Sequence, residues 1–251
     1  MAIDEVDGGG AIATITLRRP RVANRLDPAD LAAIVAHVAQ ADADPRVRVL
    51  CLAGQGRHFC GGFHIGAIDP AADGAPGARP SDRFEAMADA MENARAVTVA
   101  ALQGGVYGGA VDLALACDFR IGTPAVEAMV PPARLGLHYH RGGLERFVSR
   151  LGLAAAKRLL LGVETLDAAA LLQVGGLDRS VAPEALAAEV DAYARHLAGL
   201  APLALLPMKR HLNAIARGRL DAAAIAADIA RAWASEDLRE GSRAWAEFPP
   251  T

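Results

Sequence analysis

The stretch Leu102–Arg120, LQGGVYGGAVDLALACDFR, joins a predicted buried strand to a helix through a glycine-rich turn. The apolar run VTVAAL at residues 97–102 predicts the strand, and a helix is expected to start at about Gly109. A helix that begins at such a turn leaves backbone N–H groups free and directs the positive end of its dipole at them. We therefore expect half of an oxyanion hole at Gly109, with the carboxylate of Asp112 on the same face of the helix.

The rest of the chain alternates strand and helix patterns before it becomes entirely helical. Strands are predicted at residues 11–17, 47–53, 97–102, 119–122 and 126–130. Helices are predicted at residues 27–43 and 81–95, from 109, and at 144–150, 154–161, 167–173, 183–200, 203–215, 220–235 and 239–247. This order predicts an α/β fold, with a core over residues 1–182 and a helical C-terminal region over residues 183–251.

A second glycine-rich turn follows the strand predicted at 47–53 and reads GQGRHFCGGFH at residues 54–64. Residues 68–80 then lose all periodicity and consist mostly of Ala, Gly, Pro and Asp, so we expect a mobile surface loop over a pocket. Ser81 is expected to cap the helix that follows this loop. Two glycine loops, each after a buried strand, are therefore present.

Composition narrows the class of function. The 251-residue chain has a net charge of −3 and only 4% aromatic residues, so a nucleic-acid-binding surface is not expected. Its 3 cysteines are too few and too scattered for a disulfide framework or a metal site, and Cys51 and Cys117 are expected in the core. The sequence shows no evident base with an orienting partner for Cys60, which argues against Cys60 as a catalytic nucleophile. Neither a signal peptide nor a membrane span is predicted, which favours the cytoplasm.

The two glycine loops carry a resemblance to a known family. CGGFHI at 60–65 and GGAVDLALACD at 108–118, in this order and spacing, resemble the crotonase (enoyl-CoA hydratase/isomerase) superfamily. The early P-x-x-x-N turn at 20–24 and the A-x-x-L-L-L-G helix at 156–162 are similar too. The resemblance implies a spiral of ββα turns and a helical tail that packs against neighbouring subunits, as a homotrimer or a dimer of trimers. It also implies an acyl-CoA thioester substrate, with coenzyme A as part of the substrate and no separate cofactor or metal.

The family's shared chemistry is stabilisation of a thioester enolate, and the resemblance implies which residues perform it here. The first N–H donor of the oxyanion hole would come from Phe63 and the second from Gly109. Backbone donors suit this role because they are rigid and uncharged. Residues implied to contact the coenzyme A portion are Arg21, Val22, Gly61, Gly62, His64, Ile65 and Pro131.

The sequence departs from the hydratases of the family at their two glutamates. Asp112 keeps a carboxylate at the first position but is shorter by one methylene, and the second position is Pro132. The segment VPPARLGLHYHRGG at 130–143 is similar to the branch that includes methylmalonyl-CoA decarboxylase, which lacks the second glutamate and has a tyrosine matched to Tyr139. Tyr139 is therefore a candidate acid or orienting group.

Several interpretations stay open at this point. The chain is expected to be a lyase or isomerase of the enoyl-CoA hydratase kind, and one remaining carboxylate favours decarboxylation or double-bond movement over efficient hydration. A non-catalytic acyl-CoA-binding paralogue is the alternative. Asp112 could serve only the helix dipole, and Tyr139 could be a packing residue. His138 and His140 flank Tyr139 and are weaker candidates.

Overall fold

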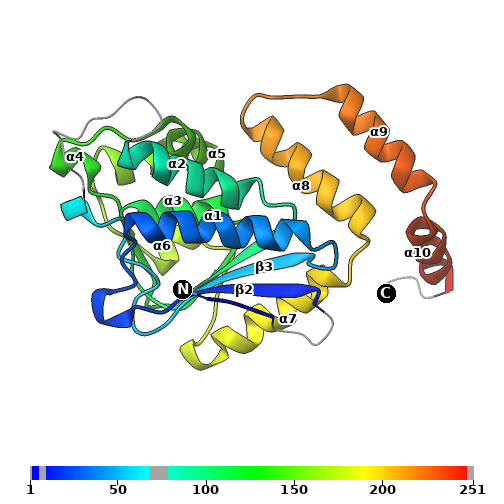
Figure 1. Cartoon of the computed structure of the whole chain (residues 1–251), viewed down its shortest axis with the longest axis horizontal. Coiled ribbons are helices and arrows are strands. Elements are labelled where there is room, and N and C mark those ends of the chain that lie inside the picture. The colour runs from blue at the N-terminus through cyan, green and yellow to red at the C-terminus, as the bar shows by residue number, and fades with distance from the viewer. Residues whose placement is uncertain (1, 6–9, 68–78, 248–251) are drawn as a thin grey trace.

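The computed structural model describes residues 2–5, 10–67 and 79–247. Residues 68–78 of the predicted surface loop lie outside these ranges, so its expected role over a pocket stays a prediction. The described chain forms an α/β body with a helical C-terminal part beside it (Figure 1).

A six-stranded sheet lies at the centre of the body, in the order β1-β2-β3-β4-β6-β9. β1 pairs with β2 antiparallel, and all the other neighbours are parallel. Its strands are β1 (Ala2–Glu5), β2 (Ile12–Leu17), β3 (Val49–Gly54), β4 (Val97–Leu102), β6 (Phe119–Gly122) and β9 (Arg179–Ser180). A smaller sheet has the order β5-β7-β8, formed by β5 (Val106–Tyr107), β7 (Glu127–Met129) and β8 (Leu166–Asp167).

Helices cover both faces of the large sheet, as Figure 1 shows. One face carries α1 (Pro28–Ala43), α2 (Pro80–Glu92), α3 (Gly109–Ala116), α4 (Pro132–Leu135), α5 (Arg141–Leu160) and α6 (Ala168–Gln173) on its side of the body. The other face is covered by α7 (Leu186–Ala198). Three further helices complete the C-terminal part, namely α8 (Pro202–Ala216), α9 (Ala222–Trp233) and α10 (Glu236–Glu247).

The strands divide their side chains between two cores because successive residues of a strand point to opposite faces. Leu50 and Leu52 of β3 join the large core under α1, α2, α3 and α5. Val49 and Cys51 of the same strand join the smaller core under α7. Near-continuous burial of β3 and β4 is what a parallel sheet covered on both faces requires.

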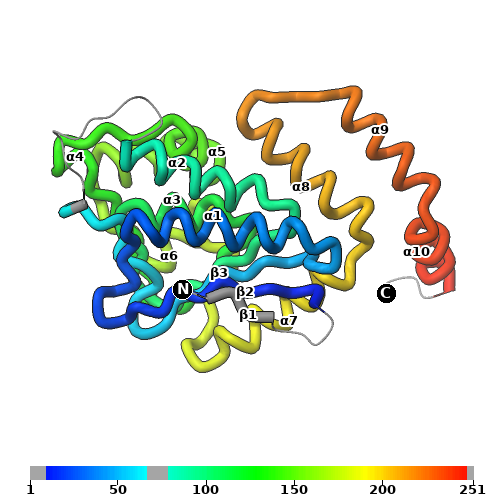
Figure 2. The backbone as a smooth tube through the Cα atoms, viewed as in Figure 1, coloured from blue at the N-terminus to red at the C-terminus, as the bar shows by residue number. Residues whose placement is uncertain are grey.

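The C-terminal helices lie progressively farther from the sheet. Figure 2 shows α8 beside the body, with α9 and α10 on the side of α8 away from it. No helix in the described part of the chain combines the length and apolarity needed to cross a membrane. The division of the chain at residue 182 stays a prediction.

Some expected elements differ from the structure for identifiable reasons. The helix expected to be capped by Ser81 begins one residue earlier, at Pro80, with Arg79 as N-cap, because proline is well suited to the first turn. The separate helices expected at 144–150 and 154–161 agree with α5, whose backbone leaves the helical conformation between them at Gly152, where φ is +75°; the first of them begins earlier than expected, at Arg141. β1 was not expected, since its acidic sequence lacks an apolar alternation. It forms a strand through its pairing with β2.

All three cysteines are buried free thiols. Cys51 and Cys117 lie in the two cores, as predicted. The Cys60 Sγ lies 3.1 Å from the carbonyl oxygen of Asn24 and accepts from the N–H of Gly62 at 3.3 Å. Burial raises the pKa of each thiol to about 12.

Candidate active site

The first glycine loop follows β3 and is held against the turn at residues 20–24. Asn24, itself in a left-handed conformation, donates from its buried amide to the carbonyls of Gln55, His58 and Phe59 at 2.9–3.0 Å. The N–H of Gly61 donates to the carbonyl of Ala23 at 2.7 Å. These bonds fix the loop, and they give the asparagine of the P-x-x-x-N turn a structural role.

Gly62 brings the two glycine loops into contact. Its φ is +83°, and a Cβ at this position would lie 2.4 Å from the carbonyl oxygen of Tyr107 and 3.2 Å from the nitrogen of Gly109. Only glycine fits such an approach without strain. The loop after β3 and the start of α3 therefore meet at Gly62 and Gly109.

The N–H of Phe63 is left available by the pairing of its neighbours. Gly62 accepts from the N–H of Leu26, and His64 donates to the carbonyl of Leu26, both at 2.8 Å. Because backbone groups alternate along an extended segment, the N–H of Phe63 points away from Leu26. No acceptor in the described part of the chain takes it. Gly109, as the first residue of α3, likewise has no intrahelical acceptor for its N–H.

Aromatic side chains surround the start of α3. The ring of Phe84 lies 2.5 Å from where a Cβ of Gly109 would stand, so this glycine also makes room for α2. Phe84 meets Phe63 edge-on with ring centroids 6.4 Å apart and lies 5.8 Å from the ring of His140. Tyr139 stacks on His140 at 4.8 Å. The site is thus an aromatic environment with two unpartnered backbone donors.

Asp112 lies one turn into α3 and is fully buried and paired. Its Oδ1 accepts from Nε of Arg146 at 2.7 Å, and its Oδ2 accepts from Nη2 of the same guanidinium at 3.1 Å. Nε2 of His140 lies 3.1 Å from Oδ2. Burial alone would raise the pKa of Asp112, but contacts with His140 and Arg146 outweigh it and lower the pKa. The carboxylate is ionised, and both of its oxygens are engaged by protein.

Tyr139 presents the opposite situation. Its hydroxyl oxygen is buried and has no hydrogen-bond partner in the described ranges. Burial, followed by the charge of Asp112, raises the pKa of this phenol well above its usual value. Tyr139 therefore stays protonated and keeps an unused donor beside the aromatic group. The fold brings Tyr139 into the region of Phe63, Gly109 and Asp112. Tyr139 stacks on His140, whose ring lies beside Asp112 and Phe84. Phe84 in turn packs against Phe63 and Gly109.

The two flanking histidines have separate surroundings. His140 is the N-cap of α5, where its Nδ1 accepts from the N–H of Gly143 at 3.1 Å. With Nδ1 accepting and Nε2 facing Asp112, both ring nitrogens are turned toward protein groups. His138 is exposed, and its Nδ1 lies 2.8 Å from the carbonyl oxygen of Tyr139.

The residues expected to contact coenzyme A lie around the same loops. Arg21 and Val22 are exposed in the turn against which Gly61 is held, and Ile65 is exposed just after the first loop. His64 is half-buried, with Nδ1 3.0 Å from Oδ1 of Asp27. On the second loop, the ring of Pro131 lies 3.8 Å from where a Cβ of Gly108 would stand.

Pro132 is the first residue of α4 and offers no acid or base at the position of the family's second glutamate. Glu127, its nearest acidic neighbour in the sequence, accepts instead from the hydroxyl of Tyr107 at 2.5 Å. Within the described ranges, no group of three or more His, Cys, Asp or Glu residues is placed to hold a metal ion.

Sequence reasoning missed two residues that shape this site, Arg146 and Phe84. Arg146 follows its partner by 34 positions and is fully buried in α5, so no local spacing connects it to Asp112. A buried arginine in an otherwise ordinary helix gives no signal in a single sequence. Phe84 lies in a helix whose approach to Gly109 depends on tertiary packing.

Comparison with known proteins identifies the family of the chain. The family described as enoyl-CoA hydratase/isomerase matches residues 7–249. A probable enoyl-CoA hydratase of Mycobacterium tuberculosis is 31% identical over 96% of this chain and 94% of its own length. A crotonyl-CoA hydratase of Syntrophomonas wolfei is 29% identical over 94% of this chain and 92% of its own.

Solved structures show the same fold. An enoyl-CoA hydratase subunit of Geobacillus kaustophilus superposes with a TM-score of 0.85 at 31% identity, covering 98% of this chain and 95% of that one. Another enoyl-CoA hydratase/isomerase family member gives a TM-score of 0.88 at 28% identity, with 98% and 93% covered. The α/β fold is therefore of the crotonase type, and this chain belongs to the enoyl-CoA hydratase/isomerase family.

Proposed function

We propose that this chain acts on an acyl-CoA thioester and stabilises its enolate between the N–H groups of Phe63 and Gly109. The observation that carries the proposal is the meeting of the two glycine loops at Gly62, with neither donor taken by an acceptor among the described residues. Donors fixed in advance cost no reorganisation when negative charge develops on the thioester oxygen, and losing one typically costs about 3 kcal/mol of transition-state stabilisation.

The acid–base groups favour a reaction other than hydration. Both oxygens of Asp112 are engaged, and Pro132 supplies no second carboxylate. A positioned acid or base contributes roughly 100- to 10,000-fold, so water addition across a double bond would lose much of its usual assistance. We therefore favour decarboxylation of a malonyl-type thioester, which needs an enolate and one delivered proton, or movement of a double bond, in which one group can remove a proton from one carbon and return it to another.

Tyr139 is the group best suited to deliver that proton. In a decarboxylation the electrons of the breaking C–C bond enter the thioester enolate as CO₂ leaves, and Cα then takes one proton. The buried, protonated hydroxyl of Tyr139 has no competing acceptor among the described residues. Solvent would restore its proton afterwards. In this scheme Asp112 is the anion beside Tyr139, and its charge helps to keep the hydroxyl protonated until the enolate forms.

The coenzyme A portion is proposed to lie along the rim formed by the turn at residues 20–24 and the first glycine loop. Arg21, Val22 and Ile65 are exposed there, and His64 is half-buried next to Phe63 in the sequence. Pro131 borders the second loop. Assembly as a homotrimer or dimer of trimers, and a cytoplasmic location, stay predictions.

A second candidate is an acyl-CoA-binding protein without turnover. It is favoured by one observation, that the single remaining carboxylate of the site is locked in a bidentate pair with Arg146. In that case the same two N–H groups would hold the thioester carbonyl without a following proton transfer.

Turnover of crotonyl-CoA and of methylmalonyl-CoA separates these functions. We expect methylmalonyl-CoA to be the better substrate, with Tyr139→Phe lowering kcat about 100-fold and Gly109→Pro, which removes the N–H, about 100- to 1,000-fold. Tyr193→Phe is the matched control, because Tyr193 packs edge-on against Phe119 on the opposite face of the sheet.

Three outcomes are decisive. Fast crotonyl-CoA hydration that survives Asp112→Asn would remove the role of Asp112 and the preference against hydration. Tight thioester binding by calorimetry without turnover of either substrate would establish the binding protein. Equal activity of Gly109→Pro and the unmodified chain would contradict the oxyanion hole itself.

A further inference from the structure

Helix α8 docks on the body through polar side chains. Lys209, Asn213 and Arg217 follow one another at intervals of four residues, so they lie on the same face of the helix. Arg217 is the C-cap that ends it. Nζ of Lys209 donates to the carbonyl of Ala96 at 2.6 Å, and the amide of Asn213 donates to the carbonyl of Glu92 at 3.0 Å. Arg217 is the last of the three and reaches farthest toward the candidate active site.

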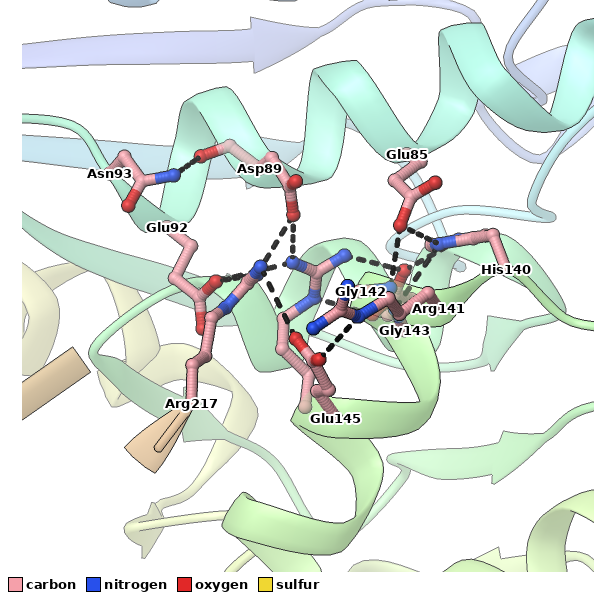
Figure 3. A network of polar contacts seen from close by, with 12 residues as sticks. Glu85, Asp89, Glu92, Asn93, His140, Arg141, Gly142, Gly143, Glu145 and Arg217 are labelled. Carbon is pink, nitrogen blue, oxygen red and sulfur yellow. Dashed lines mark hydrogen bonds and ion pairs between the residues drawn. The ribbon is translucent and has the colours of Figure 1, made fainter. Parts of the chain in front are cut away.

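Arg217 enters a cluster of charges between α2 and α5 (Figure 3). One of its terminal nitrogens, Nη2, lies 2.8 Å from Oδ1 of Asp89 and also pairs with Oε2 of Glu92. The side chain of Glu92 is only 2% exposed, so this contact is a buried one. Figure 3 shows Arg217 directed at both carboxylates, although it comes from a helix outside the α/β body.

The same two carboxylate oxygens also bind Arg146. Nη1 of Arg146 lies 2.6 Å from Oδ1 of Asp89 and 3.3 Å from Oε2 of Glu92. The remaining nitrogens of that guanidinium hold Asp112. Arg146 thus binds two carboxylates on α2, those of Asp89 and Glu92, and the carboxylate of Asp112 on α3. Arg217 supplies a second positive charge to the two carboxylates on α2.

We propose that Arg217 is a positioning residue for Asp112: by holding Asp89 and Glu92 it fixes Arg146 against the carboxylate of the site. Without Arg217, two carboxylates on α2 would compete for the guanidinium that pairs with Asp112. The state of the site then depends on the docking of a C-terminal helix that does not contact the site directly. The kinetic part of this inference rests on the proposed function, and the spectroscopic part does not.

The charges around Asp112 support this direction of effect. Groups that face it directly or through one partner are Arg146, His140 and Tyr139 on and before α5, and Asp89, Glu92 and Glu85 on α2. Arg150 also pairs with Glu92, at 3.3 Å. Removing Arg217 takes one positive charge away from the carboxylates of Asp89 and Glu92, so these would draw Arg146 toward α2.

The test uses the full chain with Arg217→Met, Arg217→Lys and the control Lys209→Met. Lys209 also anchors α8, through Ala96 and Asp118, but touches neither Asp89 nor Glu92 in the described contacts. The first readout is solvent exchange of the Nε–H of Arg146 by ¹⁵N NMR. The second is the ¹³C titration of the Asp112 carboxyl, assigned with Asp112→Asn.

Arg217→Met is expected to speed exchange at Arg146 about two- to thirtyfold, the range that networked residues transmit, and to raise the pKa of Asp112. Arg217→Lys should restore most of both signals, and Lys209→Met should leave them unchanged. If Arg217→Met moves neither signal, the inference is wrong. If Lys209→Met moves both equally, the effect is general loosening of α8 and the positioning role is wrong as well.

The acid limb of the kcat profile separates this inference from the proposed function. A shift of that limb to higher pH in Arg217→Met supports both. Spectroscopic shifts with turnover that is insensitive to Asp112→Asn support the positioning of Asp112 and overturn only its part in catalysis.

Discussion

Two consecutive helices, α7 and α8, dock on the same body by different chemistry. α7 packs apolar residues onto the sheet, whereas α8 adds inward polar residues to two leucines, Leu205 and Leu206, that pack against the same core. The inward residues are Leu186, Val190, Ala194 and Leu197 on α7, and Lys209, Asn213 and Arg217 on and at the end of α8. Apolar packing is non-directional, but each polar group needs a particular partner. Apolar fit therefore sets the position of α7, whereas the position of α8 also depends on particular polar partners.

The outward face of α8 shows the same inversion. Its apolar residues Met208, Leu212 and Ile215 are 50–66% exposed, although a helix of a lone globular domain usually turns such a face inward. Helical periodicity alone would thus orient α8 wrongly. Three measurements test the contrast between α7 and α8.

The largest effect is expected from Arg146→Met, which removes the hub of the polar cluster. It would leave the fully buried Asp112 without its arginine partner and with only His140 beside it, whereas Glu92 would keep Arg150 and Arg217. Breaking a buried pair in this way costs about 3–5 kcal/mol of the free energy of unfolding, measurable by urea denaturation. Arg158→Met, which removes half of an exposed pair with Glu164, should cost less than about 1 kcal/mol. Similar losses for both variants would mean that the polar cluster contributes no more than a surface pair.

A smaller effect is expected from Leu197→Ala on the apolar side of the comparison. Leu197 is 4% exposed beneath α7, so the truncation should cost about 3 kcal/mol, within the usual range for buried leucines. The matched variant Leu212→Ala removes a side chain that is 66% exposed and should stay within about 0.5 kcal/mol. Both are measured at a protein concentration too low for self-association. The reverse ranking would contradict the assigned faces of the two helices.

The smallest effect is expected from mild acid. Burial alone would raise the pKa of Asp89, but bonds from Arg217 and Arg146 outweigh it, and the pKa of Asp112 is lowered too. Carboxyls with lowered pKa stabilise the fold above their unfolded value of about 3.9 and lose that contribution as pH falls through the lower folded values. Amide exchange, corrected for intrinsic rates, should show α7 and α8 unchanged between pH 7 and 5. Below about pH 4, α8 should open first; simultaneous opening would contradict polar docking.

Much of the α/β body could be predicted from the sequence because its signals are local. Val97–Leu102, Phe119–Gly122 and the start of α3 at Gly109 agree with the structure at their predicted bounds. Asp27 and Pro28 likewise mark the start of α1. The two-residue strands β5, β8 and β9 were not predictable, since each exists only through pairing with a distant partner.

The candidate site divides in the same way. Its two backbone donors follow from glycine loops that are visible in the sequence, and the structure brings those loops together at Gly62. The condition of Asp112 does not follow, because it depends on Arg146 from α5 and, through α2, on Arg217. Charge networks of this kind join elements by tertiary packing and leave no periodic trace.

The burial of the three cysteines has a practical consequence for thiol chemistry. Reagents such as maleimides attack the thiolate, and with a pKa of about 12 on the order of one thiol in 100,000 is ionised at neutral pH. Access is restricted as well, since Cys60 and Cys117 are fully buried and Cys51 is only 4% exposed. The three native cysteines are therefore expected to react little with a labelling reagent. A single cysteine introduced on the exposed side of α9 would carry a fluorophore alone, with no need to remove Cys51, Cys60 or Cys117.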